Sequence, residues 1–404
     1  MKKWTLVTAV SVALGCSILG GTAGAAEKAP YVLGVVLNMT GPSANIGIAE
    51  DRGLRMVVDE VNKAGGVHGR QLKVVLLDAE GKPASAVVQS KRLIDVEKAI
   101  ALLGYSNSAI TLASMETANS GETLMIGGGA SEKVWNPTQK WVFNVVPSQK
   151  NAMTPFIVDE FSRLGYKNIA YVYLDTAVGQ TGLEAFQWSM EKKALKPAII
   201  EKYAPGSTDL SPQLTHVKTS GADALFITGF VDDTALVLKT ARDMGITIPI
   251  FSDNAIIGPE LIQLAGKSVE GVVSTSLKAL VAHELPNSDP TKKIAVALYD
   301  SYVKQYGPFS LFAGHGWDMT KMTIQALQKV DPKLDPTKDA DLKKIRSSLR
   351  DNVEGIKNFV GQNGTFNYTP DNHNGLGPNT YAPVIVKDGK WIYYKPGMTK
   401  AKGG

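Results

Sequence analysis

Two short polar segments of this sequence follow predicted strands and could hold a small anion. Residues 106–108 come after a predicted strand over residues 100–103 and before a predicted helix from Ala109, so Ser108 is expected at the helix N-cap. Free N–H groups and the helix dipole at such a terminus favour a carboxylate, and Asn107 and the Ser108 hydroxyl add polar groups. A plain helix cap without a ligand is the alternative.

The second segment is a glycine run followed by hydrogen-bond donors. Residues 127–129, which end at Gly129, let the backbone approach a ligand closely, and Ala130 and Ser131 offer N–H and hydroxyl groups. A flexible turn is the alternative. A third segment, residues 40–47, joins the first predicted strand to its helix. Because the carboxyl ends of parallel strands are where open α/β sheets place ligands, the three segments together predict one anion site.

Patterns of catalysis and metal binding are absent from the sequence. It contains no nucleophile elbow, no P-loop and no GxGxxG motif that opens a helix. Its five histidines are scattered, and its single cysteine, Cys16, lies in the N-terminal apolar segment. We therefore expect no catalytic residues, no metal and no cofactor, and a secreted enzyme is the least favoured interpretation. His315, at a predicted helix start, could touch a ligand but is more typical of a packed residue.

The composition fits two ordinary globular domains and argues against nucleic-acid binding. The chain has 404 residues, of which 44% are hydrophobic and 20% are charged. The formal net charge is +5, and it falls to +3 without Lys2 and Lys3 of the N-terminal segment. No run of four basic residues concentrates this small charge, so nucleic acid is not an expected partner.

The N-terminus has the features of an export signal. Two lysines precede an apolar stretch over residues 4–20, and small residues follow at positions 23–25. We expect residues 1–26 to be removed and the mature protein to reach the periplasm. A loose lipoprotein motif before Cys16 leaves a lipid-anchored form as the alternative.

Strand-like and helix-like segments alternate along most of the chain. Two βα series, over residues 31–126 and 148–275, predict an α/β fold of two doubly wound parallel-sheet lobes. Helices after the second series are expected to return to the first lobe, which gives a multi-strand hinge and an interlobe cleft for the ligand. The expected divisions are residues 27–147 plus about 278–355 for lobe 1, 148–277 plus about 356–396 for lobe 2, and 397–404 for a tail.

The sequence resembles the type I periplasmic binding proteins of the leucine/isoleucine/valine-binding group, which feed ABC importers. The motifs that carry the resemblance are residues 40–42, 59–69, 102–108 and 129–131. The resemblance implies that Ser108, Ala130 and Ser131 hold the ligand carboxylate and that Ile46 lines the side-chain pocket.

The second half departs from the amino-acid-binding pattern of this group. Val178 stands where the family usually has a tyrosine that covers the ligand, and Ala255 falls where an acidic residue for the α-ammonium is expected. Asp253 is close enough to take that role if the alignment shifts, and Phe230 is expected to face the cleft. The ligand is therefore a branched-chain or related amino acid, or else an aromatic or other organic acid without an ammonium group.

The function expected from these observations is binding for import. The resemblance implies a monomer that closes its two lobes on a small-molecule carboxylate and delivers it to the membrane permease of an ABC importer. A ligand-sensing receptor module with the same fold is the alternative from another functional class.

Overall fold

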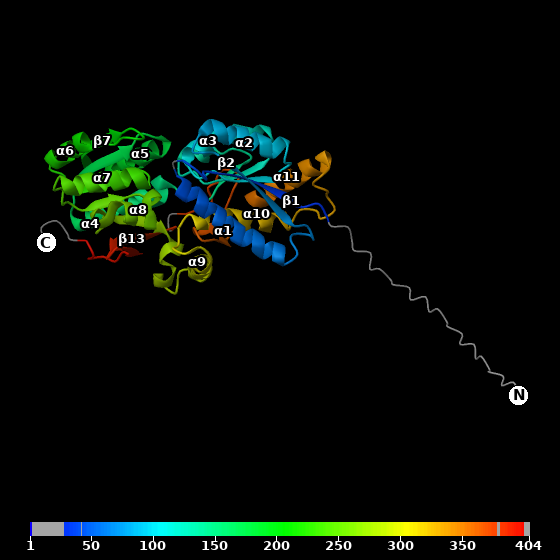
Figure 1. Cartoon of the computed structure of the whole chain (residues 1–404). Coiled ribbons are helices and arrows are strands. Elements are labelled where there is room, and N and C mark those ends of the chain that lie inside the picture. The colour runs from blue at the N-terminus through cyan, green and yellow to red at the C-terminus, as the bar shows by residue number, and fades with distance from the viewer. Residues whose placement is uncertain (2–27, 42, 378–379, 400–404) are drawn as a thin grey trace.

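The computed structural model describes residue 1 and residues 28–41, 43–377 and 380–399, and it shows two α/β lobes side by side (Figure 1). The remainder of the expected export signal, with Cys16, lies outside the described residues. Within the described ranges, no helix has the length and apolar character needed to span a bilayer.

The first lobe is built on a five-stranded parallel sheet with the strand order β2-β1-β3-β4-β5. The central strands are apolar along their whole length, because helices cover both faces of the sheet. Its strands are β1 (Tyr31–Leu37), β2 (Leu72–Asp78), β3 (Ala101–Gly104), β4 (Leu124–Gly127) and β5 (Val142–Asn144).

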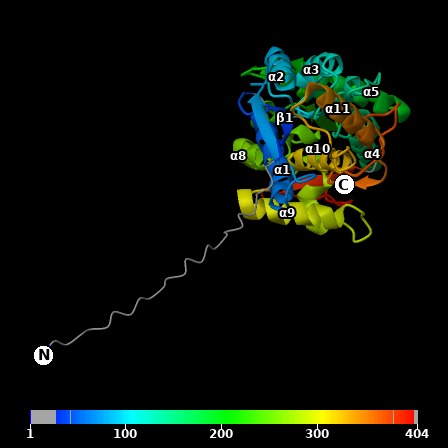
Figure 2. The same ribbon diagram turned by 90° about the vertical axis from the view of Figure 1, so that its right-hand side faces the viewer.

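Helices α2 (Pro83–Asp95) and α3 (Ser108–Ser120) cover one face of this sheet. Helices α1 (Ala44–Lys63), α10 (Ala313–Leu327) and α11 (Asp339–Glu354) cover the other face, and the turned view shows the two groups on opposite sides of β1 (Figure 2). The short hairpin of β11 (Phe359–Val360) and β12 (Thr365–Phe366) packs into the same core as α10 and α11.

The second lobe contains a seven-stranded sheet with the order β14-β13-β10-β9-β8-β6-β7. Its parallel strands are β6 (Asn168–Leu174), β7 (Lys196–Tyr203), β8 (Ala224–Thr228), β9 (Ile250–Ser252) and β10 (Val273–Leu277). The antiparallel hairpin of β13 (Tyr381–Lys387) and β14 (Lys390–Tyr393) completes the sheet. Its turn places Asp388 and Gly389 at φ 52° and 67°, as the Asp-Gly pair predicts for a tight hairpin.

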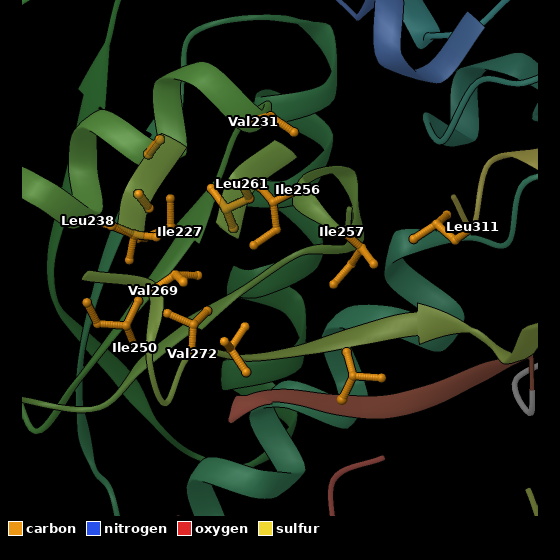
Figure 3. Close-up of a cluster of buried hydrophobic side chains, with 14 of the residues drawn as sticks. Ile227, Val231, Leu238, Ile250, Ile256, Ile257, Leu261, Val269, Val272 and Leu311 are labelled. Carbon is orange, nitrogen blue, oxygen red and sulfur yellow. The ribbon is translucent and has the colours of Figure 1, made fainter. Parts of the chain in front are cut away.

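Helices also cover both faces of the second sheet. Helices α4 (Thr154–Leu164) and α5 (Ala177–Lys192) pack on one face. Helices α6 (Ser211–Thr219), α7 (Val231–Asp243) and α8 (Pro259–Ala265) pack on the other. Figure 3 shows this second core, in which Leu238 of α7 and Leu261 of α8 meet Ile227 and Ile250 of the strands.

The chain passes between the lobes three times: after β5, between α9 (Lys292–Tyr306) and α10, and before β13. This division differs from the expected one after residue 277. Residues 278–306 pack against the second lobe, because Ala295, Leu298 and Tyr302 of α9 join the apolar cluster that holds its strands, and this cluster also includes Ile46 and Ala49 of α1. Residues 356–376, expected in the second lobe, pack on the first through Phe366 and Tyr368.

The first crossing segment is held by side chains from the third. The carbonyl oxygen of Val146 accepts hydrogen bonds from Asn144 Nδ2 at 2.9 Å and Asn374 Nδ2 at 2.8 Å. The hydroxyl of Tyr381 donates to the carbonyl oxygen of Pro147 at 3.3 Å. Two crossings are thus bonded into one hinge.

Helices α1 and α10 cross with their backbones in contact. A Cβ on Gly53 of α1 would overlap the carbonyl oxygen of Ala313, and a Cβ on Gly316 of α10 would overlap the carbonyl oxygen of Glu50. Only glycine fits at these two points, so the crossing fixes where α10 meets the first lobe.

We expect Gly316→Ala to lower the free energy of unfolding by about 1–3 kcal/mol, because the added methyl group must push the two helices apart. Gly355→Ala is the matched control, since its Cβ would lie 3.5 Å from the nearest atom. Urea unfolding followed by circular dichroism measures both variants. Equal stability of Gly316→Ala and the wild type would show that the crossing is looser than described.

Candidate functional site

Two adjoining cavities lie between the lobes at the carboxyl ends of the parallel strands, as expected for open α/β sheets. The inner cavity has a volume of about 40 Å³ and the outer one about 730 Å³. The residues that line both cavities are Asn107, Ser108, Val178 and Phe230. The inner cavity is further lined by Ile46, Ser106, Gly128, Ala130, Val146, Gln149, Asn254, Ala255, Phe312 and His315.

Asn107, and not Ser108, caps helix α3. The Asn107 Oδ1 accepts hydrogen bonds from the N–H groups of Ala109 at 3.0 Å and Ile110 at 3.2 Å. The expectation that Ser108 is the cap is therefore corrected: Ser108 is the first helical residue, and asparagine satisfies the helix terminus in its place. This arrangement leaves the Ser108 hydroxyl hydrogen available for another partner.

Ser108 and the glycine-rich segment after β4 are directly bonded to each other. The N–H of Ser131 donates to the Ser108 hydroxyl oxygen at 3.1 Å, and both residues are buried. A Cβ on Gly129 would come within 2.8 Å of Val134 and 3.3 Å of the Ser108 Cα, so glycine permits this approach. Ser106, Asn107, Ser108 and Ala130 bring hydroxyl, amide and backbone polar groups of this edge of the first sheet to the lining of the inner cavity.

The second lobe closes the inner cavity with apolar and neutral groups. Val178 lies in the first turn of α5, and Phe230 is the N-cap residue of α7. Thr181 of α5 donates its hydroxyl hydrogen to the Ser131 hydroxyl oxygen at 3.0 Å, which links the two lobes directly beside the cavity.

Asp253, Gly129 and Ser131 are not among the residues that line the inner cavity, whereas the other six predicted residues are. Asp253 is buried, and its Oδ1 accepts a hydrogen bond at 3.1 Å from the N–H of Ala255. Its side chain thus caps the 3-10 turn over Asn254–Ile256, and burial raises its pKa to about 7. The residues that reach the cavity from this turn are Asn254 and Ala255.

Several residues of the inner cavity were not predicted from the sequence. Val146 and Gln149 come from the first crossing segment, and Phe312 and His315 come from the start of α10. Gln149 has no sequence signal, because only the hinge topology brings it to the ligand site. His315 has a weak one, since a histidine at a predicted helix start is compatible with a ligand contact.

Among the residues that the structure describes, no lysine or arginine lines either cavity. The outer cavity carries three acidic residues, Asp232, Asp233 and Glu260. Burial and the neighbouring Asp232 charge raise the pKa of Asp233. Across the described residues, no group of histidine and acidic side chains is arranged to hold a metal ion. The site is therefore suited to binding through neutral donors, with an acidic outer rim.

Comparisons with known proteins agree with this architecture. A family model described as periplasmic binding protein matches residues 30–390. An amino acid binding protein of Pseudomonas aeruginosa is 27% identical over 280 residues, which are 68% of this chain and 72% of that protein. A leucine-, isoleucine-, valine-, threonine- and alanine-binding protein of the same species is 23% identical over 78% of this chain and 80% of its own length.

Solved structures show the same fold. An extracellular ligand-binding receptor from Rhodopseudomonas palustris superposes with a TM-score of 0.82 at 24% identity and covers 91% of this chain and 100% of its own. The substrate-binding protein LivJ of a branched-chain amino acid transporter from Streptococcus pneumoniae, solved with isoleucine, gives a TM-score of 0.75 at 22% identity, with 91% and 100% coverage.

We expect Asp253→Asn to make the protein less sensitive to pH. The folded-state pKa of about 7 lies above the value of about 3.9 in an unfolded chain, so the wild type loses stability as the pH rises between these values. Asparagine cannot ionise, and its stability relative to the wild type should rise by about 1–4 kcal/mol between pH 4 and pH 8. Urea unfolding at both pH values measures this change. An identical pH dependence in wild type and variant would contradict the assignment.

Proposed function

This chain belongs to the periplasmic binding protein family, whose members are binding proteins and not enzymes, and on that premise we propose that it captures a small carboxylate between its lobes for import. The observation that carries the proposal is the junction of α3 and the segment after β4. There the Ser108 hydroxyl, which accepts from the Ser131 N–H, keeps a hydrogen to donate, and Ser108 and Ala130 both line the inner cavity.

Neutral donors suit a single carboxylate in this position. Hydrogen bonds from hydroxyl and backbone groups stabilise a buried anion, and the N-terminus of α3 adds the favourable end of a helix dipole. The acidic residues Asp232, Asp233 and Glu260 at the outer cavity disfavour a second negative charge on the part of the ligand that extends there. The ligand is accordingly a monocarboxylate.

The inner cavity favours a carboxylate without an α-ammonium group. Ala255 lines it where an acidic partner would be needed, and Asp253 does not. A buried ammonium would have to rely on neutral acceptors such as the Gln149 Oε1, which is buried without a hydrogen-bond partner. The apolar lining by Ile46, Val178 and Phe230 suits an aromatic or other apolar acid.

A branched-chain amino acid is the second candidate ligand. It is favoured by the names of similar proteins, since the second Pseudomonas relative is described as binding leucine, isoleucine and valine and the Streptococcus structure contains isoleucine. In that case Gln149 and Asn254, which line the cavity, would supply the acceptors for the ammonium group.

Ligand binding is proposed to involve movement of the lobes. A carboxylic acid that reaches the inner cavity of about 40 Å³ must also extend into the outer cavity of about 730 Å³ or displace the lining residues. Three crossing segments are compatible with a hinge motion that opens the cleft and closes it on the ligand. Delivery to a membrane permease, periplasmic location and a monomeric state complete the proposal, and a receptor role would be indicated if deleting the permease left the ligand response intact.

Ligand class can be decided by thermal-shift measurements on the purified protein. We expect benzoate or 4-hydroxycinnamate to raise the melting temperature more than leucine, isoleucine or phenylalanine, because a ligand that binds only the folded state stabilises it. The corresponding amides serve as controls and should not stabilise, since they lack the carboxylate. Stabilisation by leucine alone would select the amino-acid candidate, and no response to any carboxylate would refute the proposed function.

The carboxylate site can be tested with Ser108→Ala. Loss of a hydrogen bond to a charged group should weaken binding of the stabilising carboxylate by about 10- to 100-fold in calorimetry. Ser120→Ala at the opposite end of α3 is the matched control, because its hydroxyl bonds only to backbone carbonyls of its own helix. Unchanged affinity in Ser108→Ala would remove this residue from the site.

A further inference from the structure

His315 lines the inner cavity, and one of its two ring nitrogens has a hydrogen-bond partner while the other has none. Its Nδ1 lies 3.2 Å from the Glu50 Oε1, and both side chains are almost fully buried, with exposed fractions of 4% and 1%. Its Nε2 is buried and has no hydrogen-bond partner. A buried ring nitrogen without a partner is costly unless a bound molecule supplies one.

The backbone fixes this pair in place. Glu50 and His315 lie on α1 and α10, beside the crossing at which Gly53 and Gly316 allow the two helices to touch. Gly128 gives the pair room, since a Cβ there would lie 2.9 Å from the Glu50 Oε1. Gly128 and His315 both line the inner cavity, together with Ala130 and Ser108.

The contact with Glu50 determines how the His315 ring is oriented. Among the described residues, the one ion pair that Glu50 forms is with His315. With Nδ1–H donated to the Glu50 Oε1, the ring is fixed so that its Nε2 remains for a bound molecule. A polar atom of a ligand can supply the hydrogen-bond partner that Nε2 lacks.

We propose that His315 is a ligand-binding residue whose Nε2 forms a hydrogen bond with an oxygen of the bound carboxylic acid, with Glu50 as the positioning residue that orients the ring. This inference rests on the proposed function. The oxygen belongs either to the carboxylate itself or to a second polar group on the ligand, such as a ring hydroxyl.

His373 offers a contrast within the same lobe. It is also buried and also paired with a glutamate, its Nε2 lying 3.1 Å from Glu354 Oε1. Its Nδ1 lies 2.8 Å from the carbonyl oxygen of Val142, so both ring nitrogens have protein partners. Both ring nitrogens of His373 are thus satisfied by the protein, whereas the Nε2 of His315 is not.

Calorimetry with benzoate, 4-hydroxybenzoate and leucine tests the proposal on the full mature protein. We expect His315→Leu to weaken binding by about 10- to 100-fold, and His315→Gln to weaken it less, because glutamine keeps a donor near the Nε2 position. Glu50→Gln, which keeps an acceptor for Nδ1–H, should likewise lose less affinity than Glu50→Leu. His373→Leu is the matched control and should lower the melting temperature without lowering affinity.

The pattern across ligands identifies the oxygen. An equal loss for benzoate and 4-hydroxybenzoate assigns it to the carboxylate, and a loss confined to 4-hydroxybenzoate assigns it to the ring hydroxyl. Affinity of His315→Leu within twofold of wild type for each ligand that binds would overturn the proposal while leaving the proposed function intact. Wild-type protein that binds none of the three would refute both.

Should His315→Leu not fold, nuclear magnetic resonance of wild-type protein with ¹⁵N-labelled histidine gives the same decision. The Nε2 resonance of His315, assigned by its absence from His315→Gln, should shift when the ligand is added. An unmoved resonance at saturating ligand would overturn the proposal.

Discussion

The contact between the backbones of α1 and α10 is the constraint on which the rest of this structure depends. Two glycines, Gly53 and Gly316, bring the helices so close that carbonyl oxygens occupy the space of side chains. The chain runs through the second lobe before it reaches α10. The contact between α1 and α10 therefore brings the chain back to the first lobe, and the chain then leaves it again for β13. Three crossings, and therefore a hinge instead of a flexible linker, are the topological result.

The first lobe contributes polar groups to the site, and the second lobe contributes mainly apolar side chains. The first lobe supplies donors whose positions are fixed by helix capping and by the bond between Ser131 and Ser108. The second lobe contributes Val178 and Phe230, which exclude water without adding charge. In such an enclosed space, hydrogen bonds to an anion are stronger than in water, and any polar group without a partner is costly. Under the proposed function, selectivity would depend both on the ligand groups that the cavity pairs and on those that it leaves without a partner.

The sequence predicts the first half of this arrangement well, because local patterns determine it. Alternating apolar runs and capped helices identify β1 to β4 and their helices, and the strand ends then identify residues such as Ser108 and Ala130. The motif over residues 62–69, which carries much of the family resemblance, has a structural role: Asn62 bonds the backbone N–H of Leu72 at 2.8 Å. Local patterns could not show which lobe α9 packs against, because its apolar stripe would fit either one. They also could not show that Gln149 reaches the cavity from the hinge and His315 from α10.

Under the proposed function, lobe closure and ligand binding involve neighbouring residues of one segment, and this links affinity to lobe movement. The Ser131 hydroxyl belongs to the segment that offers donors to the ligand, and it also accepts the hydrogen bond from Thr181 across the cleft. On the other side of the cleft, Arg52 of α1 donates to the Tyr302 hydroxyl of α9 at 3.1 Å. Such interlobe bonds are few, and each is exchanged for bonds to water when the cleft opens, so they bias the equilibrium only modestly. A ligand that satisfies buried groups from both lobes at once gains contacts in the closed state alone, and this differential binding is what can drive closure.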